Sequence, residues 1–258
     1  MQIITSVSNP WMKRIKLLSR KKYRQEYGEF VLEGLRICEE AIKRKPDLIK
    51  AVFISSSKVE RYEELLSERT IQGKAFEVSE GLLTGVLKTE NSQEIAIIIE
   101  KPAWKEKSSE YKKIVVVDGV QDPGNLGTIA RTALAAGMDA MYCLPGTVDY
   151  YNDKTVRATM GAILELPVFE IIDFENWKKN FINRGFTFLL ADIQAKKNIF
   201  DFSFPAKSAV ILGNEGSGCI HEWNESEKIA IPLQGGVESL NVAVAAGIIF
   251  YEIWRSGV

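Results

Sequence analysis

Three glycine-rich segments in the second half of the chain carry residue types that could bind a ligand and do chemistry on it. They span residues 115–137, 209–218 and 229–252. Each begins with a run of apolar, mostly β-branched residues that predicts a buried β-strand. Open α/β sheets bind ligands beyond the carboxyl ends of their strands, so we expect the three segments to build one site.

The first segment, VVVDGVQDPGNLGTIARTALAAG, predicts a strand, a Pro-Gly-Asn turn and a helix from about Leu126 to Ala136. Gly124 and Gly127 would let a ligand approach the backbone closely. The unpaired N–H groups at the start of the helix favour an anion, and Arg131 in the second turn could reach the same place. A plain glycine-rich turn beside a surface arginine is the alternative. The spacing matches neither GxGxxG nor a P-loop, so a dinucleotide fold is poorly supported.

The second segment, AVILGNEGSG, predicts a strand that stops at Gly213 and a tight glycine-rich turn after it. Glu215 in that turn could accept a hydrogen bond or act as a base. The third segment, IAIPLQGGVESLNVAVAAGIIFYE, predicts a short strand, a loop and the last helix. Ser239 is expected to cap this helix, with Asn241 in its first turn. A plain turn and a plain cap are the alternatives for these two segments.

The elements that must position these segments alternate between strand and helix over residues 113–258, which predicts an α/β domain with a mostly parallel sheet. Residues 101–112, KPAWKEKSSEYK, are polar and charged and predict a linker. The alternative is a long loop inside one domain. Residues 1–100 also mix strands and helices. The predicted division is therefore 1–100, a linker 101–112, and 113–258.

Composition excludes several classes of protein. The chain has 258 residues, of which 46% are hydrophobic and 26% charged, as in ordinary globular proteins. No apolar run reaches the roughly 20 residues of a membrane-spanning helix. The three cysteines are scattered, so we expect no disulfide framework, no metal site and a reducing, cytoplasmic location. The single histidine, His221, has no GxSxG partner motif and is not expected to be a catalytic base.

The charge is unevenly distributed although the net charge is only −1. Residues 1–25 hold seven Lys or Arg and no Asp or Glu, and residues 1–50 carry a local charge of +6. Such a basic end on an acidic body can contact phosphate. A solvated amphipathic helix is the alternative.

Taken together, the motifs resemble one family. They are N-x-G-x-x-x-R-T-A at 125–133, K-x-x-R-A-x-M-G-A at 154–162, L-G-N-E-G-x-G at 212–218 and I-P-L…S-L-N-V-A-V-A at 231–245. The order and spacing are similar to those of the SpoU (TrmH) family of RNA ribose 2′-O-methyltransferases, in the SPOUT superfamily. The N-terminal motifs S-x-x-N-P at 6–10 and F-V-L-E-G-x-R at 30–36 are similar to its substrate-binding domain. One departure lies in the motif Thr-x-x-x-Gln-Gly that members often have before the last strand of this domain. Here it begins at Thr89 and ends with Glu94 in place of glycine, which argues against RNA contacts by this loop and not against the chemistry.

The resemblance implies a C-terminal SPOUT domain with a deep trefoil knot and a mostly parallel sheet, preceded by a small L30e-like α/β domain that binds RNA. It implies a homodimer formed through the catalytic domain, S-adenosylmethionine as cofactor, and neither a metal nor a membrane. The implied cofactor-binding residues are Leu212, Gly213, Asn214, Gly216, Ile231, Leu233, Ser239 and Leu240. The implied catalytic residues are Arg131, Glu215, Asn125, Ser239 and Asn241. The expected RNA-binding residues are Lys13, Lys21, Lys22, Arg24 and Arg36.

The implied reaction is methylation of a ribose 2′-OH, with ribosomal RNA favoured as substrate. The alternatives are a tRNA 2′-O-methyltransferase, a base methyltransferase of the same superfamily, a non-catalytic RNA-binding member of the fold and, outside the family, a nucleotide-dependent oxidoreductase. Family-based proposals make Arg131 the base. A guanidinium stays protonated in proteins, so a phosphate clamp is the easier role for it, and Glu215 is the second candidate for the base.

Overall fold

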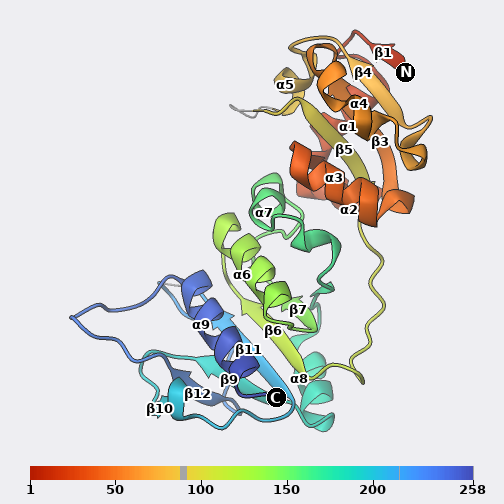
Figure 1. Ribbon diagram of the computed structural model, residues 1–258. Coiled ribbons are helices and arrows are strands. Elements are labelled where there is room, and N and C mark those ends of the chain that lie inside the picture. The colour runs from red at the N-terminus through yellow and green to blue at the C-terminus, as the bar shows by residue number, and fades with distance from the viewer. Residues whose placement is uncertain (88–91, 215, 258) are drawn as a thin grey trace. The chain divides into compact units, whose positions relative to one another are not determined.

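The computed structural model describes residues 1–87, 92–214 and 216–257, and it divides into two compact units. The N-terminal unit comprises Met1–Ala103 with Tyr151–Leu164, and the C-terminal unit comprises Trp104–Tyr150 with Glu165–Val258. Figure 1 shows the elements of both units. Each unit has its own sheet.

The N-terminal unit is built on a five-stranded sheet with the order β1-β4-β3-β5-β2. Strands β1, β4 and β3 run parallel to one another, while β5 pairs antiparallel with both β3 and β2. Short helices lie between the strands. The strands are β1 (Gln2–Ile4), β2 (Glu29–Glu33), β3 (Ile49–Ser55), β4 (Ala75–Val78) and β5 (Ile95–Glu100), and the helices are α1 (Pro10–Leu18), α2 (Lys21–Tyr27), α3 (Leu35–Arg44), α4 (Glu63–Leu66), α5 (Leu82–Leu87) and α7 (Asp153–Ala158).

Helix α1 shows how the basic N-terminal sequence folds. Asn9 caps it by accepting a hydrogen bond from the Trp11 N–H at 2.8 Å, as its type and place predict. Met12, Ile15 and Leu18 share one face and are buried in the core against β3 and β4. The same helical periodicity leaves Lys13 and Lys16 exposed.

The helix α7 lies in the N-terminal unit although it follows β7 in the sequence. Arg157 of α7 pairs with Glu33 of β2 at 3.8 Å, and the rings of Tyr151 and Phe30 lie 5.0 Å apart. These contacts group residues 151–164 with the first hundred residues, whereas the sequence division placed them with 113–258.

Glu94 adopts a backbone conformation that favours glycine. Its φ is 57°, in the left-handed region that side chains adopt at a cost. The side chain forms an ion pair with Lys58 at 3.5 Å and accepts a hydrogen bond from Ser57 at 3.1 Å. The backbone therefore keeps the turn that glycine would make, and the side chain is held by two neighbours. Thr89, which begins the same motif, lies outside the described residues.

The C-terminal unit is built on a seven-stranded sheet with the order β10-β12-β9-β11-β6-β7-β8, in which every pair of neighbours is parallel. This confirms the predicted mostly parallel α/β architecture. The strands are β6 (Lys113–Asp118), β7 (Ala140–Cys143), β8 (Val168–Glu170), β9 (Thr187–Ala191), β10 (Lys197–Asn198), β11 (Ser208–Gly213) and β12 (Glu227–Ala230), and the helices are α6 (Pro123–Ala135), α8 (Phe174–Asn183) and α9 (Val242–Arg255).

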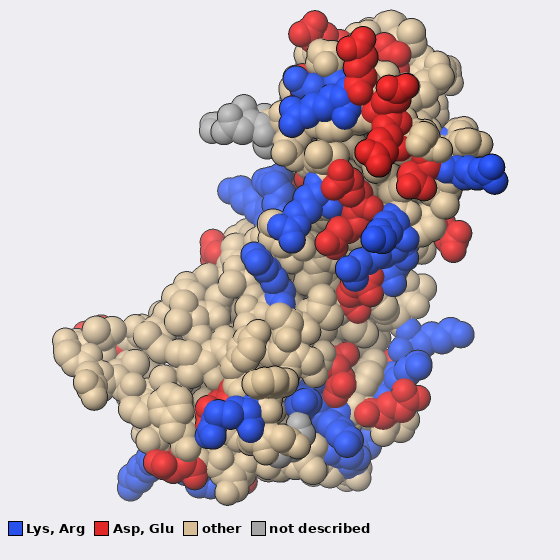
Figure 2. Space-filling model, in the orientation of Figure 1, with Lys and Arg blue, Asp and Glu red and all other residues tan. Residues whose placement is uncertain are grey.

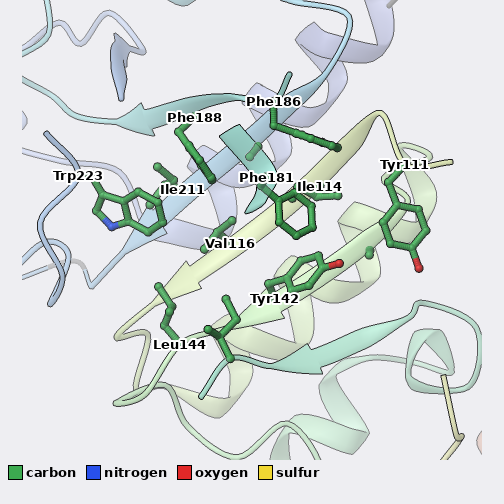
Figure 3. Close-up of a cluster of buried hydrophobic side chains, with 13 residues drawn as sticks. Tyr111, Ile114, Val116, Tyr142, Leu144, Phe181, Phe186, Phe188, Ile211 and Trp223 are labelled. Carbon is green, nitrogen blue, oxygen red and sulfur yellow. The ribbon is translucent and has the colours of Figure 1, made fainter. Parts of the chain in front are cut away.

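Both faces of this sheet are covered. Ile114 and Val116 of β6 belong to an aromatic cluster with Tyr142 and with Phe181 of α8, as Figure 3 shows. Successive residues of a strand point to opposite faces, so Val115 and Val117 point to the side of α6 and α9. These two helices pack on each other over the face of this sheet that is turned to the viewer in Figure 1. Among the described residues, no helix is long and apolar enough to cross a membrane.

Candidate functional site

A cavity of about 470 Å³ lies at the carboxyl edge of the parallel sheet in the C-terminal unit. It opens where β9, β11 and β12 end and is closed by the start of α9. Its volume is within the roughly 300–1,000 Å³ of small-molecule sites. All eight predicted cofactor-binding residues line it: Leu212, Gly213, Asn214, Gly216, Ile231, Leu233, Ser239 and Leu240.

The turn after β11 forms one wall of this cavity. The backbones of Asn214 and Gly218 exchange two hydrogen bonds, at 2.8 and 2.9 Å. The Asn214 side chain accepts from the N–H groups of Gly216 at 2.9 Å and Ser217 at 3.2 Å. One amide side chain thus holds the described residues of this turn together. Glu215, the predicted second candidate for the base, lies outside the described residues.

Gly213 is required by a close approach of two backbone segments. A Cβ built on it would lie 2.6 Å from the Gly218 carbonyl carbon and 2.7 Å from the Cys219 nitrogen. Backbone atoms cannot move aside as the end of a flexible side chain can. Any side chain here would therefore open the turn that lines the cavity.

A pair of asparagines connects the first and third segments. The Asn241 Nδ2 donates to Asn125 Oδ1 at 2.9 Å. The Asn241 Oδ1 accepts from the N–H groups of Ala243 and Val244, so Asn241 is the N-cap of α9. The prediction that Ser239 caps this helix is wrong, because the helix begins two residues later than that cap requires. Ser239 instead lines the cavity.

The first segment also starts its helix earlier than predicted. Asp122 caps α6 by accepting from the Asn125 N–H at 2.7 Å, and Pro123 occupies the first helical position. Arg131 consequently lies in the third turn. It is exposed, about one and two-thirds turns beyond Asn125, and it is not among the described residues that line the cavity.

Asp118 binds the segment that follows the turn, through His221 and Trp223. It is fully buried at the end of β6 and accepts from the His221 N–H at 3.0 Å and Trp223 Nε1 at 2.9 Å. The His221 Nδ1 lies 2.9 Å from its other oxygen. Burial and the nearby Asp118 charge raise the pKa of the Cys219 thiol to about 12. This arrangement gives His221 a structural contact with the end of β6.

Sequence reasoning missed the residues at the end of β9 and directly after it. Leu190, Asp192 and Gln194 line the same cavity. The available signal was the one used for the other strands, a polar residue directly after an apolar run, here Thr187–Ala191 followed by Asp192. Among the described residues, no group of three or more His, Cys, Asp or Glu could hold a metal ion.

The predicted RNA-binding residues lie in the N-terminal unit, and one of them is wrongly assigned. Lys13, Lys21, Lys22 and Arg36 are exposed. Arg24 is only 4% exposed, and its guanidinium donates to the Leu18 carbonyl at 2.7 Å. It closes the end of α1 and is not available to a ligand. On the face in Figure 2, Lys and Arg of this unit are interspersed with Asp and Glu.

Comparison with known proteins agrees with this arrangement. Residues 112–251 match the model of the SpoU rRNA Methylase family. The chain belongs to this family. Residues 9–96 match the MRM3-like substrate binding domain. The fold and the family resemblance predicted from the motifs are therefore confirmed.

Relatives and solved structures cover the chain from end to end. A 23S rRNA (guanosine(2553)-2′-O)-methyltransferase of Bacillus subtilis is 33% identical over 98% of this chain and 99% of its own. A 23S rRNA (uridine(2479)-2′-O)-methyltransferase of Streptomyces viridochromogenes is 26% identical over 99% of this chain and 92% of its own. The AdoMet-bound rRNA methyltransferase of Sinorhizobium meliloti superposes with a TM-score of 0.84 at 27% identity, covering 100% of this chain and 98% of the other.

Proposed function

We propose that this protein is a cytoplasmic enzyme that transfers a methyl group from S-adenosylmethionine to a ribose 2′-OH of ribosomal RNA. One observation carries the proposal: eight residues from two distant family motifs line a single cavity at the carboxyl edge of the sheet. The names of the relatives support ribosomal RNA as the substrate class. The deep knot implied by the family resemblance is part of the proposal.

The cavity fits a nucleoside-containing cofactor. Its wall combines apolar side chains, such as Leu212, Ile231 and Leu240, with the backbone of a glycine-rich turn. Apolar surface can cover a base, and backbone N–H and C=O groups near Gly213 can hydrogen-bond to it. When bound, S-adenosylmethionine supplies an electrophilic methyl group on a sulfonium. The protein's part is then to position the ribose and to accept its proton.

Arg131 and the asparagine pair are the proposed groups for positioning RNA. Arg131 is exposed and can bind a phosphate through two parallel N–H donors. A guanidinium holds its proton at neutral pH, so we assign it clamping and not proton abstraction. Asn125 and Asn241, joined at 2.9 Å, would fix the ribose beside the cavity. Glu215 is the proposed base.

The proposal is tested by transfer of a labelled methyl group from S-adenosylmethionine to total RNA, with ribosomal and transfer RNA separated. The RNA comes from cells that lack this protein. Label that survives alkali within a dinucleotide of the ribosomal fraction is expected, because 2′-O-methylation blocks cleavage at that position. Label in the tRNA fraction overturns the substrate class. Absence of both label and S-adenosylmethionine binding overturns the activity.

The N-terminal unit is proposed to bind RNA through Lys13, Lys21, Lys22 and Arg36. Each phosphate contact contributes about 0.7–0.9 to the slope of log K against log salt concentration. Replacing all four by glutamine is expected to lower that slope by about 3 and to weaken binding at low salt. Titrating labelled ribosomal RNA fragments at several salt concentrations measures both. A control that replaces Lys43, Lys50, Arg61 and Arg69 of the same unit should change the slope by less than about 1. An equal decrease of the slope in the two variants would contradict the assignment of the RNA-binding residues.

We also propose that the protein is a homodimer through α9 and α6. Val244, Ile248, Tyr251 and Trp254 follow one face of α9 at helical spacing, and Trp254 is 62% exposed. Leu134 of α6 adds to this apolar surface. Figure 2 shows a broad, largely uncharged area over α9 and the loop before it. Contiguous exposed apolar surface marks an interaction site.

Charges placed on this face are expected to separate the subunits. The variant V244E/W254E should sediment as a monomer at micromolar concentration, where the unmodified protein sediments as a dimer. The matched control is I172E, because Ile172 is an equally apolar residue, 94% exposed, that lies before α8. Dissociation by I172E, or a monomeric unmodified protein, would contradict the proposal.

A further inference from the structure

Asp192 brings a negative charge into the wall of the cavity. It directly follows β9, whose neighbours in the sheet are β11 and β12, the two strands whose loops carry the predicted cofactor residues. Among the described residues that line the cavity, Asp192 is the charged one. The remaining wall is apolar or neutral, so this carboxylate is the strongest described acceptor that a bound molecule would meet.

The two oxygens of Asp192 are oriented but not saturated. Oδ1 accepts from the Gln194 N–H at 2.8 Å, and Oδ2 lies 2.9 Å from the Lys228 ammonium. A carboxylate has about four lone-pair sites, so each oxygen can accept one more hydrogen bond. The hydrogen bond from Lys228 holds the pKa of this carboxyl below its usual value, with the Gln194 N–H contributing. The group is therefore an acceptor and never a donor near neutral pH.

We propose that Asp192 accepts hydrogen bonds from the vicinal ribose hydroxyls of the cofactor and thereby selects a ribonucleoside. The inference rests on the proposed function, since it assigns a residue to the cofactor of that reaction. Two adjacent hydroxyl donors match a carboxylate with one remaining site on each oxygen. An acidic side chain after a parallel strand holds ribose hydroxyls in the same way in dinucleotide-binding sheets.

An ion pair with Lys228 is the competing role for Asp192. The Lys228 side chain is 58% exposed, and exposed ion pairs contribute little to stability. If pairing were the whole role, removing either partner would have the same effect. The two roles therefore separate when the lysine and the carboxylate are changed one at a time.

The experiment measures the dissociation constants of S-adenosylhomocysteine and of its 2′,3′-dideoxy analogue by calorimetry or by competition with labelled S-adenosylmethionine. The proteins compared are the unmodified chain, Asp192→Asn and Lys228→Met. Asp192→Asn is expected to weaken S-adenosylhomocysteine binding about tenfold or more, as expected for loss of a charged hydrogen bond. It should change binding of the dideoxy analogue less than threefold. Lys228→Met should change both constants less than threefold.

Three other results are possible, and each would overturn either the recognition of the hydroxyls or the proposed function. Equal weakening of both ligands by Asp192→Asn, or equal weakening of S-adenosylhomocysteine by Asp192→Asn and Lys228→Met, would overturn recognition of the hydroxyls. Failure of the unmodified protein to bind S-adenosylmethionine would instead overturn the proposed function. Thermal unfolding monitors each variant. If Asp192→Asn is unfolded, Asp192→Ser replaces it, because serine keeps an oxygen acceptor for the Gln194 N–H.

Discussion

Replacing Arg131 by alanine is expected to lower the rate of methyl transfer by about 10²–10³-fold while the dissociation constant of S-adenosylmethionine changes less than threefold. The reason is its position. Arg131 is exposed on the third turn of α6 and lies outside the wall of the cavity, whereas the predicted cofactor residues lie within it. A side chain placed there can orient the RNA without touching the adenosine. Single-turnover transfer to ribosomal RNA gives the rate, and calorimetry gives the affinity.

The variant Arg131→Lys provides the control for charge. Lysine keeps the positive charge but cannot donate two parallel hydrogen bonds to a phosphate. If Arg131 clamps a phosphate, the lysine variant should recover part of the rate and keep an unchanged pH profile. A loss of cofactor affinity in the alanine variant would place Arg131 in the cofactor site and contradict the assignment. Full activity of the alanine variant would remove it from the mechanism.

The carboxyl-edge site could be predicted because its residues follow strands with a clear apolar pattern. The apolar runs at 209–212 and 229–231 are visible in the sequence, and the rule that parallel strands end at one edge brings their loops together. Asp192 follows the same pattern after β9, but the segment around it lacks glycines and a family motif, so nothing singled it out. Its place in the cavity wall follows from the order of the strands in the sheet, which puts the end of β9 between those of β11 and β12.

Other features depend on tertiary contacts that spacing cannot reveal. Arg24 looks like its exposed neighbours Lys21 and Lys22 in the sequence, yet α2 turns it toward the carbonyl of Leu18. Asn241, and not Ser239, caps α9 because the helix begins at Val242. From this position the Asn241 side chain also donates to Asn125, a tertiary contact that spacing does not reveal. The segment 151–164, which contains the six-residue helix α7, likewise belongs to the N-terminal unit, where Arg157 pairs with Glu33.

Replacing Gly213 by alanine is expected to weaken S-adenosylmethionine binding at least 100-fold, with methyl transfer lost in proportion. Added to the backbone, the methyl group would lie 2.6 Å from Gly218 and 2.7 Å from Cys219, and these atoms belong to a turn tied by two backbone hydrogen bonds. The turn must open to make room. Asn214 and Gly218 would then leave the cavity wall together, because their backbones are joined by two hydrogen bonds and the Asn214 side chain holds Gly216 and Ser217.

The matched control lies three residues away in the same turn. Gly216 also lines the cavity, but a Cβ there meets only the Asn214 side-chain oxygen, at an ordinary 3.6 Å. Gly216→Ala should therefore change the dissociation constant by less than about fivefold. Both variants add one methyl group to the same wall. A difference between their dissociation constants is therefore due to the close backbone approach at Gly213. Equal affinities would show that the turn is pliable and that its observed shape does not determine cofactor binding.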